Sequence, residues 1–144
     1  MKYYFDTSAL VKLFSNEAGS EIVKAMVSDP SNHIWVLELA QIEIICAIHR
    51  KYRNNEFPKD NLEPLLKAIY NQFNLFSVIP LDAAIAAEAQ LLIKRFGKEI
   101  ALKTLDALHI AGWFVLANPD WCFVSSDHNQ LKVVEILNHQ TIQI

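Results

Sequence analysis

Short apolar runs alternate with longer amphipathic stretches along the chain. The short runs predict strands at Lys2–Phe5, His33–Leu37, Phe76–Ile79 and Trp121–Ser125. Between them, apolar residues recur every three or four positions. This spacing predicts helices at Glu21–Ser28, Leu39–Arg53, Pro58–Phe73, Asp82–Phe96 and Thr104–Ala117.

The alternation of strands and helices favours one fold class. Parallel strands need long crossover connections, which are usually helices, so the order predicts an α/β fold with a mainly parallel sheet covered on both faces. No internal repeat, low-complexity tract or Pro/Gly-rich linker divides the 144 residues. We therefore expect a single domain that covers residues 1–144.

The composition is that of a globular protein from a reducing compartment. Hydrophobic residues make up 52% of the chain, charged residues 20%, and there are only three glycines, which excludes a disordered chain. Cys46 and Cys122 lie in apolar stretches without CxxC spacing, which favours buried, reduced thiols. The opening MKYYFDTSAL carries an aspartate where a signal peptide would be apolar, and no apolar run reaches the ~20 residues of a membrane span. These features predict a cytoplasmic location.

Two aspartates follow predicted strands. Asp6 comes directly after KYYF, and Asp127 comes directly after WCFVSS. In open parallel sheets, ligands bind beyond the carboxyl ends of the strands, near the point where the strand order reverses. Either aspartate could instead cap a helix or form a turn.

Glu43 and Asp106 lie among apolar residues on predicted helices. A carboxylate buried there needs a cation, a hydrogen-bonding network or a metal as its partner. The alternatives for Glu43 are a partly exposed position at the edge of the apolar stripe or an ion pair with Arg50. The alternative for Asp106 is a first-turn position in which it interacts with the helix dipole. His109 lies one turn after Asp106 and fits a core or supporting position better than a metal ligand.

Oxygen ligands without paired His or Cys suit the hard cations Mg²⁺ and Mn²⁺. Such ions polarise phosphoryl oxygens and activate water, which favours phosphodiester hydrolysis. The formal net charge of -3 opposes nucleic-acid binding, but two divalent cations would more than cancel it. Substrate could be held by basic residues near helix ends, which could equally be solvated surface charges: Arg50, Lys51 and Arg53, and Lys94, Arg95, Lys98 and Lys103.

Four segments, FDTSALVKLF, IEIICAIHR, LDALHIA and FVSSDHNQL, together resemble the PIN domain, and in particular the VapC-like toxins of toxin–antitoxin pairs. Their order, their approximate separations and the chain length agree over the whole sequence. Two departures are visible. Leu37 and Glu38 stand where VapC-like sequences commonly carry a serine, and Ser125-Ser126-Asp127 stands where the family usually has TxD.

The resemblance implies a three-layer α/β/α sandwich with the acids at the C-terminal edge of the sheet, and an endoribonuclease that depends on Mg²⁺ or Mn²⁺. It implies Asp6, Asp106 and Asp127 as the main metal ligands and Glu43 as a further ligand or a base that orients water. Supporting hydroxyls would come from Ser8 and Ser125.

The resemblance also implies three partners: an RNA substrate, a small antitoxin protein and a second copy in a homodimer. The long apolar stretch Phe57–Phe76 is a candidate surface for the protein partners.

Two other functions remain open from the sequence. A signalling receiver domain needs paired acids after its first strand, but FDTSAL offers one, and SVIPLD offers only Asp82 as an acceptor, past a proline. A PIN-like module that binds RNA or protein without cleaving is the second alternative. The presence of all four acids argues against it, and a cleavage assay separates it from a nuclease.

Overall fold

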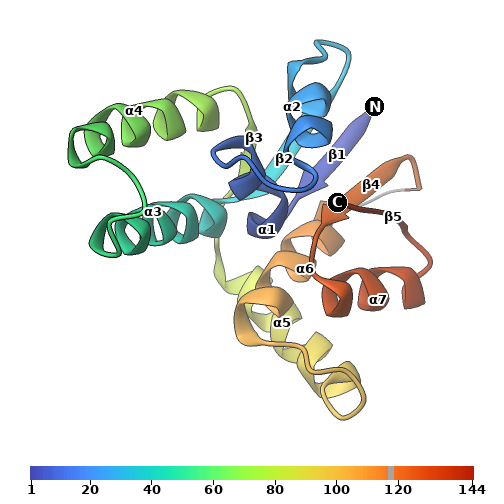
Figure 1. Ribbon diagram of the computed structural model, residues 1–144. Coiled ribbons are helices and arrows are strands. Elements are labelled where there is room, and N and C mark those ends of the chain that lie inside the picture. Colours follow the sequence, from blue (N-terminus) through green and yellow to red (C-terminus); the bar gives the residue numbers. More distant parts are fainter. Residues whose placement is uncertain (117–118) are drawn as a thin grey trace.

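A parallel sheet forms the centre of the computed structural model, which describes residues 1–116 and 119–144 (Figure 1). Its strand order is β3-β2-β1-β4-β5, and all four pairings are parallel. The order therefore reverses between β1 and β4. The strands are β1 (Lys2–Phe5), β2 (His33–Leu37), β3 (Ser77–Ile79), β4 (Trp121–Ser125) and β5 (Gln140–Gln143).

Helices cover both faces of the sheet, so the predicted α/β/α sandwich is confirmed. One core cluster joins the sheet to α1 (Thr7–Leu10), α2 (Ser20–Ser28), α3 (Glu38–Arg53) and α4 (Leu62–Phe73). The other joins it to α5 (Ala83–Phe96), α6 (Thr104–Leu116) and α7 (His128–Ile136). Two short 3-10 turns, η1 (Val11–Leu13) and η2 (Lys59–Asn61), follow α1 and precede α4.

The middle strand shows why both layers are needed. Side chains alternate along β1, so Tyr3 and Phe5 pack into the core of α1–α4 while Tyr4 packs into the core of α5–α7. Tyr4 stacks on Phe123, with ring centroids 5.5 Å apart, and meets Trp113 edge-on at 5.9 Å. A strand buried on both faces has a continuous run of apolar or aromatic residues, as Tyr3, Tyr4 and Phe5 form here.

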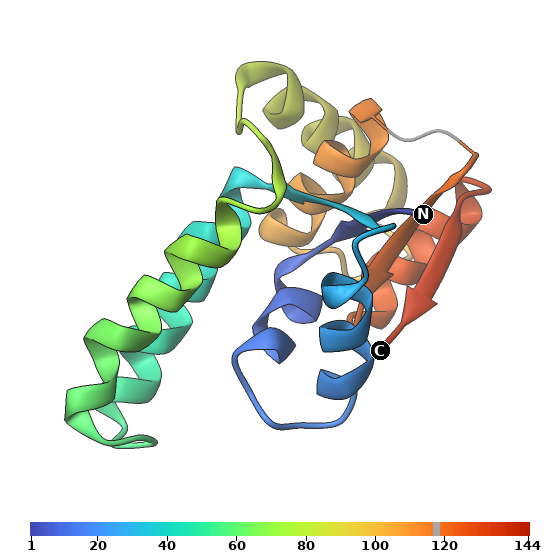
Figure 2. The ribbon, with the colours of Figure 1, turned by 90° about the horizontal axis from the view of Figure 1, so that it is seen from above.

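The paired helices α3 and α4 form an arm that extends away from the sheet (Figure 2). Ile48 of α3 and Ile69 and Phe73 of α4 are buried in the same core cluster. The arm therefore continues the core of the α1–α4 layer beyond the edge of the sheet.

Several expectations need correction. Neither α7 nor β5 was predicted, because α7 opens on polar residues and β5 is a polar edge strand, QTIQ. The predicted helix Pro58–Phe73 begins as an α-helix only at Leu62, and the end predicted at Ala117 lies outside the described residues. Cys122 is buried as expected, but Cys46 is exposed, because α3 buries the opposite face. In the two described ranges, no helix combines the length and the apolar character needed to cross a membrane.

The Tyr4 hydroxyl generates a first prediction. It is fully buried and has no hydrogen-bond partner among the described residues. An unpaired buried hydroxyl costs free energy, so Tyr4→Phe should raise the free energy of unfolding, by about 1 kcal/mol. Urea unfolding measures this change.

The matched control is Tyr3→Phe, since the Tyr3 hydroxyl lies 3.2 Å from Sδ of Met1 on the other face of the strand. That variant should gain no stability. A Tyr4→Phe protein less stable than the parent would show that the hydroxyl is satisfied in solution.

Candidate active site

A pocket of about 280 Å³ lies at the carboxyl edge of the sheet, where the strand order reverses. Asp6 reaches it from the end of β1 and Asp127 from the end of β4, while Glu43 comes from α3 and Asp106 from α6. The structure thus brings the four predicted acids into the lining of one pocket. The other lining residues are Thr7, Ser8, Val11, Ala47, Arg50, His109 and Gln130.

Asp6 is the most deeply buried of the four acids, at 1% exposure. Its Oδ1 accepts a hydrogen bond from the backbone N–H of Ala9, so it caps α1. Hydroxyls also surround it, since Ser8 Oγ lies 2.8 and 2.9 Å from its two oxygens and Ser125 Oγ donates to Oδ2 at 2.7 Å. Burial raises the pKa of Asp6, although these hydrogen bonds, and His109 whenever its ring is protonated, act to lower it.

Ser125 links the two aspartates at the strand ends. Its hydroxyl donates to Asp6 and accepts the backbone N–H of Asp127 at 2.9 Å. The carboxylate of Asp127 in turn accepts the N–H groups of Asn129 and Gln130 and so caps α7. Asp6 and Asp127 therefore each cap a helix and also line the pocket.

Asp106 sits in the first turn of α6. Its Oδ2 accepts the backbone N–H of Lys103 at 3.0 Å, and Nε2 of Gln130 lies 3.4 Å from Oδ1. Burial raises the pKa of this carboxyl, and the negative charge of Asp127 raises it further, against the effect of the Lys103 N–H. Asp106 therefore accepts an N–H in the first turn of α6, and its carboxylate is also repelled by the charge of Asp127 in the pocket.

Glu43 is held by two side chains from other helices. Its Oε2 accepts a hydrogen bond from Oγ1 of Thr7 and lies 2.6 Å from Nε2 of His109. Burial alone would raise the pKa of Glu43, but the hydrogen bonds from His109 and Thr7 outweigh burial and lower it. Within the described ranges no ion pair joins Glu43 to Arg50, so that alternative is not what satisfies the carboxylate.

Three polar residues of the pocket were not predicted as catalytic or metal-binding residues: Thr7, Gln130 and His109, the last of which was expected in a core or supporting position. A signal existed for each of them. Thr7 directly follows Asp6, while His109 and Gln130 each come three residues after a predicted acid and so share its side of a helix.

The basic residues predicted to contact substrate lie in different parts of the structure. Arg50 lines the acid pocket. Lys51 instead pairs with Glu56 at 3.2 Å and lines a different pocket. Arg53 and Lys103 are exposed and belong to the lining of neither pocket. Of these four predicted substrate contacts, Arg50 has its side chain in the acid pocket, and Lys103 meets Asp106 through its backbone N–H.

The spacing of the acids bears on metal binding. Across residues 1–116 and 119–144, no three His, Cys, Asp or Glu side chains lie close enough to hold one ion jointly. The donor set nevertheless consists of carboxylate oxygens, and Mg²⁺ commonly keeps several waters while binding one or two carboxylates directly. The lining therefore fits a hydrated hard cation better than a dehydrated one.

Comparisons with known proteins identify the fold and the family. Among curated proteins, none matches the sequence. Solved structures do match in fold, with 14% sequence identity in each of three cases. VapBC-1 from nontypeable Haemophilus influenzae has a TM-score of 0.68 and covers 99% of this chain and 98% of its own.

The second structure is FitAcB from Neisseria gonorrhoeae, with a TM-score of 0.69 and coverage of 98% of this chain and 96% of its own. VapC20 of Mycobacterium tuberculosis, a sarcin-ricin loop cleaving toxin, has a TM-score of 0.67 and covers 90% and 93%. These likenesses concern the fold. The model of the PIN domain family matches residues 3–112, which is most of the sequence. The chain therefore belongs to the PIN domain family.

Proposed function

We propose that this protein is a metal-dependent endoribonuclease that hydrolyses phosphodiester bonds of single-stranded or looped RNA. PIN domains are generally nucleases. The observation that carries the proposal for this chain is the convergence of Asp6, Glu43, Asp106 and Asp127 on one pocket at the switch point of a parallel sheet. A purely structural use of four carboxylates would not require them to share one pocket.

The proposed cofactor is Mg²⁺ or Mn²⁺, held by Asp6, Asp106 and Asp127, with Glu43 as a further ligand, directly or through one of the waters that complete the coordination. When bound, such an ion polarises a phosphoryl oxygen and lowers the pKa of water. The site unit includes β4 and α7, beyond residue 112, because Asp127 lies between them. We therefore treat residues 1–144 as one PIN domain.

Neighbouring residues of this chain hold the acidic side chains in position. Ser8, Ser125 and the Ala9 N–H hold both oxygens of Asp6, so that carboxylate is fixed before any ligand arrives. Glu43 keeps a lowered pKa and is therefore ionised at neutral pH, as a residue that accepts a proton from water must be. Arg50 is the cation best placed to contact a phosphate, because it lines the same pocket.

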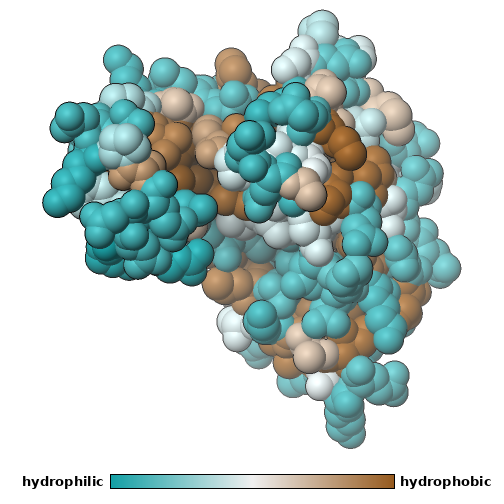
Figure 3. Space-filling model, viewed as in Figure 1, coloured by the Kyte–Doolittle hydropathy of each residue, from teal (hydrophilic) through white to brown (hydrophobic). Residues whose placement is uncertain are grey.

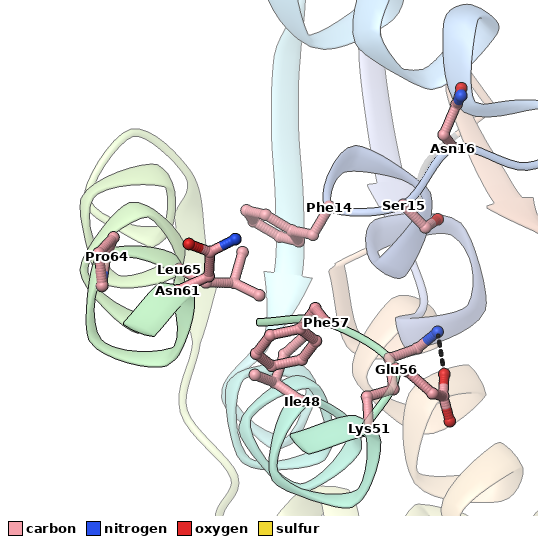
Figure 4. A pocket seen from close by; sticks show the side chains of 10 residues that line it. All are labelled: Phe14, Ser15, Asn16, Ile48, Lys51, Glu56, Phe57, Asn61, Pro64 and Leu65. Carbon is pink, nitrogen blue, oxygen red and sulfur yellow. Dashed lines mark hydrogen bonds and ion pairs between the residues drawn. The ribbon is translucent and has the colours of Figure 1, made fainter. Parts of the chain in front are cut away.

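A second pocket suggests where a protein partner binds. It has a volume of about 520 Å³ and lies between the arm and the segment after α1 (Figure 4). Phe14, Ile48, Phe57 and Leu65 give it an apolar lining. Figure 3 shows brown, hydrophobic surface beside the arm. We propose that a small antitoxin occupies this groove, which includes part of the predicted surface Phe57–Phe76. The homodimer stays a prediction, and light scattering of the purified chain would check it.

The nuclease proposal predicts that the purified protein cuts single-stranded RNA with Mg²⁺ or Mn²⁺ and stops in EDTA. Asp6→Asn should remove more than about 90% of the activity, because an amide binds these ions poorly, while its oxygen can still cap α1. Cleavage of a labelled RNA is the measurement.

Asp82→Asn is the matched control, since Asp82 also caps a helix, α5, but lies outside the acid pocket. It should cleave like the parent. An Asp6→Asn protein within about tenfold of the parent, a barrier change of ~1.4 kcal/mol, would show that Asp6 holds no metal. Full activity of the parent in EDTA would contradict the metal mechanism.

Burial of the charge, together with repulsion from Asp127, predicts a stability effect at Asp106. In EDTA at neutral pH, Asp106→Asn should unfold with a free energy higher by about 0.5–1 kcal/mol, because the raised pKa of this carboxyl shows that its charge is disfavoured in the fold. The gain is modest because the carboxylate is partly exposed and solvent screens it. Thermal melts measure it.

Added Mg²⁺ should stabilise the parent more than this variant, since the ion binds the native parent better. If Asp106 served only the first turn of α6, the substitution would lower stability or leave it unchanged, and Mg²⁺ would affect both proteins alike.

The partner proposal predicts that expressing this chain slows growth, and that co-expressing an antitoxin encoded beside it restores growth. Leu65→Lys should keep the growth defect but weaken the rescue, because a charge in the apolar groove disfavours docking. Growth curves of the four combinations are the measurement. A chain with RNase activity and no effect on growth would instead be a housekeeping nuclease.

A further inference from the structure

Three helices meet at one carboxylate oxygen beside the acid pocket. Oε2 of Glu43, on α3, accepts a hydrogen bond from Thr7 of α1 and lies 2.6 Å from Nε2 of His109 on α6. Nε2 of His109 and Oγ1 of Thr7 are 3.0 Å apart, which closes a triangle of polar atoms. Oε1 of Glu43 has no hydrogen bond to any residue that the structure describes. One oxygen is therefore held, and the other is left for a ligand.

The surroundings of His109 favour its contact with Glu43. Its side chain is 2% exposed, and its Nδ1 is buried without a partner among the described residues. With hydrogen on Nε2, the ring donates to Glu43 and leaves Nδ1 as an unpaired acceptor. A side chain that served only to fill the core would be better apolar, since it would avoid burying an unpaired nitrogen. The contact through Nε2 is what distinguishes histidine from an apolar residue here.

We propose that His109 is a positioning residue for Glu43, with Thr7 as the second donor. A free glutamate side chain has considerable rotational freedom, which would have to be lost when a ligand binds. Two donors on Oε2 restrict this freedom in advance, and hydrogen bonds to a carboxylate in a partly buried site are strong. Oε1 is thereby presented to a hydrated cation or to the attacking water. The catalytic consequence rests on the proposed function, whereas the contact itself does not.

The test compares variants that keep or remove each donor. His109→Gln retains an N–H at about the reach of Nε2 and His109→Leu removes it, while Thr7→Ser retains the hydroxyl and Thr7→Val removes it. His139→Leu is the control, because His139 packs on Trp113 and Phe114 and precedes β5, at the opposite edge of the sheet. Two readouts are the dissociation constant for Mn²⁺, from electron paramagnetic resonance of the unbound ion, and the RNA cleavage rate.

His109→Leu and Thr7→Val should each weaken Mn²⁺ binding and cleavage by about 10- to 100-fold, the effect typical of removing a group that orients a ligand. His109→Gln and Thr7→Ser should stay within about threefold of the parent, and His139→Leu should match it. A folded His109→Leu protein that binds Mn²⁺ and cleaves like the parent would overturn the proposal. If that variant does not fold, Thr7→Val decides by the same criterion.

A third readout separates this proposal from the proposed function. Melting temperatures are compared for His109→Leu, Glu43→Leu and the double variant, all in EDTA. The shifts should be non-additive, because either single change already removes the shared contact. A parent that neither binds Mn²⁺ nor cleaves RNA would overturn the nuclease, and non-additive shifts would then still support the positioning contact. Additive shifts would overturn the contact whatever the activity.

Discussion

The parallel pairing of β1 with β4 is the constraint on which the site depends. Its register places Phe5 opposite Val124, so the residues that follow, Asp6 and Ser125, emerge side by side at the carboxyl edge. The Ser125 hydroxyl then donates to Asp6 and accepts the N–H of Asp127. Because side chains alternate along a strand, a shift of one residue would turn Ser125 to the other face and separate the two aspartates.

Each acid of the pocket also has a structural task. Asp6 and Asp127 cap the helices that follow their strands, Asp106 accepts an N–H at the start of α6, and Glu43 joins α3 to α1 and α6. These bonds compensate for the cost of bringing carboxylates together in a partly buried pocket. The compensation is incomplete at Asp6 and Asp106, where burial still raises the pKa.

Helix α3 connects the two pockets of the molecule. Glu43 and Arg50 line the acid pocket, while Ile48 and Lys51 line the apolar groove beside the arm. The residues of the two linings are interleaved along α3. Successive residues of a helix point about 100° apart around its axis, so the adjacent Arg50 and Lys51 face different pockets. A partner in the groove would therefore contact the same rigid helix that carries Glu43, without needing to enter the acid pocket.

The sequence alone determined the strands β1, β2 and β4, the parallel sheet, and the four acids as candidates, because apolar periodicity and strand-end aspartates are local signals. It missed α7 and β5, whose polar residues give a weak pattern, and it assigned Cys46 to the interior from its apolar neighbours. Only the tertiary structure decided that Thr7, His109 and Gln130 join the acids, and that Lys51 turns away to Glu56. Those outcomes depend on contacts such as that between His109 and Glu43, 66 positions apart, and spacing along the chain does not specify such contacts.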